Sequence, residues 1–177
     1  MPNLSKISFV LSMALMVTFA TVKANAQEYE PWTGTVTGAT IHLGSHDTLS
    51  NIRRMINAGR TAEAVLESKK FIASLNTNTR SGVTHRYLYD GYNALCISHT
   101  AHKEFDEALK ACDQAIEHTP ARWQAYNSRG SLNYKTGNFA NALNDYRSAL
   151  ENAPDATHIR RIIEHNIRIS EARVTEN

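Results

Sequence analysis

Apolar side chains recur at helical spacing in two stretches of the chain that lie 34 residues apart. In the first stretch they are Phe105, Ala108, Leu109, Cys112, Ala115 and Ile116, and in the second Phe139, Ala142, Leu143, Tyr146, Ala149 and Leu150. Both sets follow the spacing i, i+3, i+4, i+7, i+10 and i+11, which places them along one face of an α-helix. Each stretch therefore predicts an amphipathic helix, and the two helices are copies of one pattern.

The residues around these two helices repeat as well. The matched pairs are Tyr92 with Tyr126, Cys96 with Gly130, and Pro120 with Pro154. Between the halves of each copy the apolar pattern is broken, by Lys103-Glu104 in one and by Gly137-Asn138 in the other. Each copy therefore predicts a helix, a tight turn and a second helix. A fixed period of helix pairs is typical of a repeat array rather than of a single closed core.

The side chains that recur are Tyr92, Leu95, Phe105, Ala108, Ala115 and Pro120 in one copy, and Tyr126, Gly130, Gly137, Phe139, Ala142, Tyr146, Ala149 and Pro154 in the other. In these residues the chain resembles the tetratricopeptide repeat (TPR) family. Arg129 and Asn133 depart from the family pattern, which usually has apolar or aromatic side chains at these two positions. The resemblance implies an all-α solenoid that binds a protein or peptide partner, although a fold alone does not name the partner.

Weaker patterns flank the two clear copies. Leu49, Ile52 and Ile56 form one apolar stripe, and Ala64, Val65, Phe71 and Ile72 form another beyond a turn at Gly59. We therefore predict a degenerate repeat one at residues 45–75, ahead of repeat two at 89–122 and repeat three at 123–156. Residues 76–86 are rich in Asn, Thr and Ser, which suits either a surface loop or an extended start of the next helix.

One further helix is predicted after repeat three, at residues 157–173. Its apolar face holds Ile159, Ile162, Ile163 and Ile167, and its other side holds Arg160, Arg161, Glu164 and Arg168. A solenoid needs a terminal helix with a polar outer face, so we interpret this helix as a cap. Repeats one to three and this cap form a predicted TPR-like domain at 45–173. The arginines leave an acidic ligand as the alternative, although solvated helix faces are commonly charged.

Residues 1–26 have the pattern of a secretory signal peptide. Lys6 precedes an uncharged apolar run, Ile7 to Val22, and Ala24-Asn25-Ala26 supplies a cleavage pattern. The alternative is a membrane anchor, but the run is shorter than the roughly 20 residues that a spanning helix needs. We expect an exported protein, periplasmic or secreted, that starts at Gln27. Residues 27–44 are predicted to be a flexible leader, with a short hairpin over repeat one as the alternative.

Composition and motifs narrow the function further. Without Lys6 and Lys23, the 19 basic residues fall to 17 and balance the 17 acidic ones, so the chain has no electrostatic preference for nucleic acid or an anionic membrane. The chain contains no GxSxG, SxxK or GxxxxGK[ST] motif. We therefore expect neither an enzyme nor a bound cofactor.

Cysteines and histidines are the remaining candidates for chemistry. Cys96 and Cys112, the only cysteines, fall on the two helices of repeat two. An exported protein can form a disulfide, but helices that reverse at Lys103 place Cys96 opposite about Ala108. The sequence thus favours free thiols, and pairing stays open. His99 and His102 lie three residues apart near a turn, without the further ligands of a metal motif, so we expect surface histidines and no metal site.

The resemblance to TPR arrays also implies a binding groove lined by the first helix of each repeat. On this sequence that stripe is Asp90, Asn93, Ile97 and Thr100 in repeat two, and Gln124, Asn127, Ser131 and Tyr134 in repeat three. The matched amides of Asn93 and Asn127 suit hydrogen bonding to an extended peptide backbone. Solvated polar residues without a ligand are the alternative for the stripe. A structural subunit of an envelope assembly, or less favourably a small-ligand or metal binder, is the alternative for the whole protein.

Overall fold

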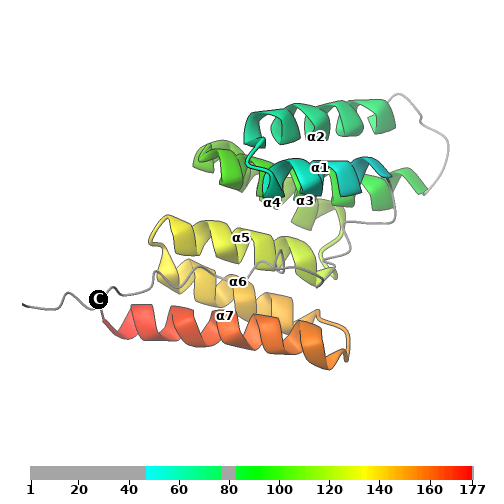
Figure 1. The fold of residues 1–177 in the computed structure, drawn as a ribbon. Helices are drawn as coiled ribbons and strands as arrows, with labels where there is room; N and C mark the ends of the chain where they lie inside the picture. Colours follow the sequence, from blue (N-terminus) through cyan, green and yellow to red (C-terminus); the bar gives the residue numbers. More distant parts are fainter. Residues whose placement is uncertain (1–46, 77–82, 177) are drawn as a thin grey trace, which may run out of the picture.

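The computed structural model describes residues 47–76 and 83–176, and all regular secondary structure within them is helical (Figure 1). The described helices are α1 (Asp47–Asn57), α2 (Thr61–Asn76), α3 (Val83–His102), α4 (Phe105–His118), α5 (Trp123–Lys135), α6 (Phe139–Glu151) and α7 (Thr157–Thr175). This confirms the predicted all-α fold. The signal peptide and the leader predicted at residues 1–26 and 27–44 lie outside the described residues.

The helices are arranged as a solenoid. Every described helix packs against the next one in sequence, and α3 also contacts α1 and α5. Figure 1 shows the stack running from α1 and α2 at one end to α7 at the other. Because contacts are made mainly between neighbours along the chain, stability has to come from the faces that adjacent helix pairs share. The three pairs α1–α2, α3–α4 and α5–α6 correspond in position to the predicted repeats one, two and three.

The same turn reverses the chain inside each repeat. Gly59, Lys103 and Gly137 have φ values of 73°, 65° and 79°, in the left-handed region. In each turn the amide after this residue donates to a carbonyl five residues back: Arg60 to Met55, Glu104 to His99, and Asn138 to Asn133. Glycine adopts this conformation without strain, whereas Lys103 does so at a cost of about 1–2 kcal/mol. The shared turn shows that α1–α2 is built like the two clear copies.

The helix bounds differ from the predicted ones at two places. Repeat two was predicted to start at residue 89, but its first helix begins at Val83. Of the two alternatives for residues 76–86, the extended start of the next helix therefore holds for residues 83–86. The terminal helix, predicted to end at residue 173, continues to Thr175. None of the described helices is long and apolar enough to cross a lipid bilayer.

Buried apolar clusters join the repeats. One cluster draws Val65 and Ile72 from α2 together with Cys96, Cys112 and Leu132 from α3, α4 and α5. Another joins α5, α6 and α7; its buried members are Trp123, Ala142, Tyr146, Ala149 and Ile163. The terminal helix thus covers the end of the core with the apolar face expected of it. Leu109 is an exception to the predicted stripes, since 41% of it is exposed on α4.

Candidate interaction surface

Half of the predicted groove is buried. The exposed fractions of Asp90 and Asn93 on α3 are 2% and 1%, and those of Asn127 and Ser131 on α5 are 3% and 2%. The expectation that these four side chains face solvent is therefore wrong in this structure. Because α3 and α5 pack directly on each other, much of this face meets a neighbouring helix instead of an open groove.

The two matched asparagines join successive helices of the array. The hydroxyl of Ser128 on α5 donates to Oδ1 of Asn93 on α3 at 2.8 Å. One step further along, Nδ2 of Asn166 on α7 donates to Oδ1 of Asn127 on α5 at 3.1 Å. A buried amide without a partner costs stability, so these bonds favour one relative position of the helices. In this structure Asn93 and Asn127 hold the array together.

Asp90 joins repeat two to the start of repeat three. Its carboxylate lies 2.8 Å from Nη1 of Arg122, and the Arg122 guanidinium lies 3.8 Å from the centre of the Tyr89 ring. The Tyr89 hydroxyl accepts a hydrogen bond from the backbone amide of Ala125 at 2.9 Å. Burial raises the pKa of Tyr89 well above its ordinary value, so this phenol stays protonated. The predicted groove residue Asp90 thus belongs to the contact between α3 and the residue that precedes α5.

The other stripe residues remain half-exposed: Ile97 and Thr100 on α3, and Gln124 and Tyr134 on α5. We call these four residues the accessible stripe. Each is also anchored within the domain; for example, the Thr100 hydroxyl donates to the Cys96 carbonyl at 2.8 Å, and the Tyr134 ring packs edge-on against Phe139 at 5.1 Å. The accessible stripe therefore presents one aliphatic, one aromatic, one amide and one hydroxyl side chain, and no charge.

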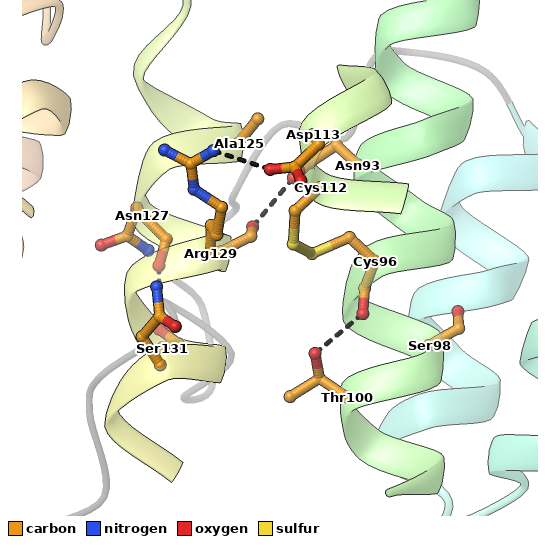
Figure 2. The surroundings of a disulfide bond; sticks show 12 residues. Asn93, Cys96, Ser98, Thr100, Cys112, Asp113, Ala125, Asn127, Arg129 and Ser131 are labelled. Carbon is orange, nitrogen blue, oxygen red and sulfur yellow. Dashed lines mark hydrogen bonds and ion pairs between the residues drawn. A yellow bond between two sulfur atoms is a disulfide. The ribbon is translucent and has the colours of Figure 1, made fainter. Parts of the chain in front are cut away.

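The two cysteines form a disulfide between α3 and α4, with a Cα–Cα distance of 5.0 Å (Figure 2). This corrects the expectation of free thiols. The cysteines lie eight residues either side of Glu104, whereas the expected position of Cys96 opposite Ala108 would centre the pair of helices at His102, two residues earlier. Centring at Glu104 brings the two Cα atoms within the roughly 4.4–6.8 Å that a disulfide spans.

At the matched position of repeat three, the two helices pack closely without a disulfide. Gly130 and Tyr146, which align with Cys96 and Cys112, lie so close that a Cβ on Gly130 would be 2.7 Å from the Tyr146 ring. A covalent bridge in repeat two and a glycine–aromatic contact in repeat three therefore occupy the same place in the fold. The sequence contained this signal, because the alignment of the copies already matched both pairs.

A comparison with known protein families agrees with this geometry. A family model described as tetratricopeptide repeat matches residues 95–165, from within α3 to within α7. Residues 95–165 belong to the tetratricopeptide repeat family. The α1–α2 pair lies outside the matched residues, and its turn at Gly59 has the same geometry as the turns at Lys103 and Gly137. No curated protein matches the chain.

The departures from the TPR pattern in α5 form a polar network. Nη2 of Arg129 lies 2.6 Å from Oδ1 of Asp145 on α6, and Asn133 donates to Oδ2 of the same carboxylate at 2.8 Å. Nη1 of Arg129 also lies 2.7 Å from Asp113 on α4. Burial lowers the pKa of Arg129, but the hydrogen bonds to Asp145 and Asp113 outweigh it, so that this pKa lies above its ordinary value.

Repeat two has apolar side chains at the positions of the Arg129–Asp145 pair. Arg129 aligns with Leu95 and Asp145 with Ala111, 34 residues earlier, and both of these belong to one buried apolar cluster. The two matched positions therefore hold a complementary pair in each repeat: two apolar side chains in repeat two and two opposite charges in repeat three. Arg129 and Asn133 looked out of place on the sequence because Asp145, their shared partner, lies on the other helix.

The histidines near the repeat-two turn serve packing. His99 is only 2% exposed, which corrects the expectation of a surface position, and its Nδ1 lies 2.5 Å from the Glu104 carboxylate. His102 is exposed, and its Nδ1 lies 2.9 Å from the Thr61 hydroxyl on α2. Within the described residues no group of three or more His, Cys, Asp or Glu side chains is arranged to hold a metal ion.

Proposed function

We propose that this TPR protein is exported and that its helix array binds a segment of another protein. The observation that carries the proposal is the array itself: α1, α3 and α5 contact one another in series, within a chain whose family generally mediates protein–protein interaction. Export rests on the charge, apolar run and small residues of the first 26 residues.

The accessible stripe is the surface that we propose for the partner. Ile97 and Tyr134 offer apolar contact, while Thr100 and Gln124 offer hydrogen-bonding groups beside it. Such a mixture suits an extended peptide, whose backbone needs donors and acceptors and whose side chains need apolar contact. With no charged side chain in the stripe, binding should respond weakly to salt.

The test is capture of a partner from the native exported fraction with the mature protein as bait. The variant Thr100→Arg with Gln124→Arg places two long charged side chains on the accessible stripe, at half-exposed positions of α3 and α5. The matched control is Gln114→Arg with Asn141→Arg, at exposed positions of α4 and α6. Thermal melting verifies that both variants keep the fold.

We expect the stripe variant to bind the partner at least about tenfold more weakly than the parent does. Introduced charges and steric clashes at an interface each cost on the order of 1.4 kcal/mol or more of binding free energy. The control variant should capture the partner like the parent protein. Normal capture by the stripe variant, together with loss in the control, would place the partner on the α4–α6 side and overturn this choice of surface.

A further inference from the structure

The disulfide of repeat two lies beside the contact between repeats two and three. Asn93, three residues before Cys96, accepts the hydrogen bond from Ser128 at 2.8 Å. Asp113, the residue after Cys112, lies 2.7 Å from Arg129. Figure 2 shows Arg129 and Asp113 facing each other beside the bridge. The two helices tied by the disulfide thus carry two of the polar contacts that hold α5 against repeat two, and Tyr89, two turns before Cys96 on α3, carries another to the amide of Ala125.

The bridge also determines how closely α3 and α4 can lie. Two bonded sulfurs are about 2.05 Å apart, whereas non-bonded heavy atoms need about 3.5–4.0 Å. The Cα–Cα distance of 5.0 Å is toward the short end of the disulfide range, and both cysteines have 0% exposure. Because neither cysteine is exposed, a reductant reaches the bond only when α3 and α4 open locally. The freed sulfurs then need more room than the bonded pair, which favours a shift of α3 relative to α4.

That movement is transmitted to the next repeat. A shift of α3 displaces Asn93 from Ser128, and a shift of α4 displaces Asp113 from Arg129, because both acceptors lie within one turn of a cysteine. Hydrogen bonds weaken steeply once their distance or angle leaves a narrow range. Repeat three has no such sensitivity, since Gly130 and Tyr146 make its matching contact without a redox-active atom.

We propose that Cys96–Cys112 is a redox-sensitive coupling between repeats two and three. With the bond intact, the described helices α1 to α7 behave as one cooperative array. A dithiol reductant opens it by exchange: one reductant thiolate attacks a cysteine sulfur and releases the other as a thiol. The second reductant thiol then frees the remaining cysteine and closes a cyclic disulfide. Two electrons and two protons pass to the protein, and α5–α7 is uncoupled from α1–α4.

Hydrogen–deuterium exchange of the full mature chain, with and without dithiothreitol, tests the proposal independently of any partner. Alkylation of the unfolded protein verifies the state of the thiols. On reduction, we expect amides of α3 and α5 to exchange at least about tenfold faster, while the centres of α2 and α6 change less. The thermal midpoint should fall by roughly 10 °C. Unchanged exchange in the reduced protein, or an equal rise in every helix, would overturn the coupling.

Two variants separate the bond from its surroundings. Cys96→Ala with Cys112→Ala should exchange like the reduced protein and be indifferent to reductant. Cys96→Gly with Cys112→Tyr installs the contact of repeat three and should protect α5 whether or not reductant is present. The proposal would be contradicted if the alanine variant protected α5 as well as the oxidised parent does. It would also be contradicted if the glycine–tyrosine variant exchanged as fast as the alanine variant.

Discussion

Replacing Arg129 by leucine should destabilise the protein far more than a surface charge change does. Asp145 is buried, with only 8% of its side chain exposed, and Arg129 approaches both of its carboxylate oxygens. After Arg129→Leu, the carboxylate keeps the amide of Asn133 but has no cation. Removing one partner of a buried ion pair costs about 3–5 kcal/mol, and the 26% exposure of Arg129 places the expected loss near the lower end.

A second substitution, Asp145→Ala, should restore most of the stability that Arg129→Leu removes. Arg129→Leu with Asp145→Ala reproduces the pairing of Leu95 with Ala111 in repeat two, which is buried and apolar. We expect the double variant to be about 1–2 kcal/mol less stable than the parent. Exchanging both partners of an ion pair for apolar groups is often neutral, but the buried amide of Asn133 loses its acceptor. Asp113 loses its cation as well, but it is 53% exposed and should contribute little.

Urea unfolding of the parent, the two single variants and the double variant measures the coupling between these residues. The coupling free energy should reach at least about 2 kcal/mol, since the two side chains are in direct contact. Additive effects, or a loss below about 1 kcal/mol for Arg129→Leu, would refute the interpretation of this pair as a buried substitute for apolar packing.

Three further outcomes follow from named contacts. Asn166→Ala removes the donor to Asn127 and should cost about 1–3 kcal/mol in urea unfolding, whereas Asn141→Ala on the exposed face of α6 should cost almost nothing. Gly130→Ala forces a Cβ to within 2.7 Å of a fully buried tyrosine ring, and should lower stability by about 1–3 kcal/mol although alanine favours helices; a gain in stability would contradict the close packing. N-terminal sequencing of the exported protein should begin at Gln27, and retention of the preceding residues would favour the membrane anchor.

The helices were predictable because their apolar residues recur at a spacing that only a helix brings onto one face. The weak α1–α2 pair was also found from sequence, since Gly59 lies five residues before Ala64 as Gly137 does before Ala142. The bounds were less accurate. The first turn of α3 precedes the repeat pattern and carries no matched residue in α5, so its start at Val83 left no periodic signal.

The candidate site was predicted less well, for a physical reason. Periodicity identifies which residues share a helix face, but it does not say whether that face meets solvent or another helix. Asn93 and Asn127 look like solvent-facing residues along their own helices, and their partners Ser128 and Asn166 lie 35 and 39 residues away. The disulfide was missed for a similar reason: a shift of two residues in the centre of the helix pair decides whether the cysteines meet.

The central claim is that a protein partner lies along α3 and α5 of this TPR array. The most direct measurement places a photo-crosslinking amino acid at Gln124, on the accessible stripe, or at Gln114, on the exposed face of α4, and irradiates the protein in the cells that produce it. The account predicts a discrete crosslinked partner from position 124 and none from position 114. A partner crosslinked only from position 114, or equally from both positions, would contradict it.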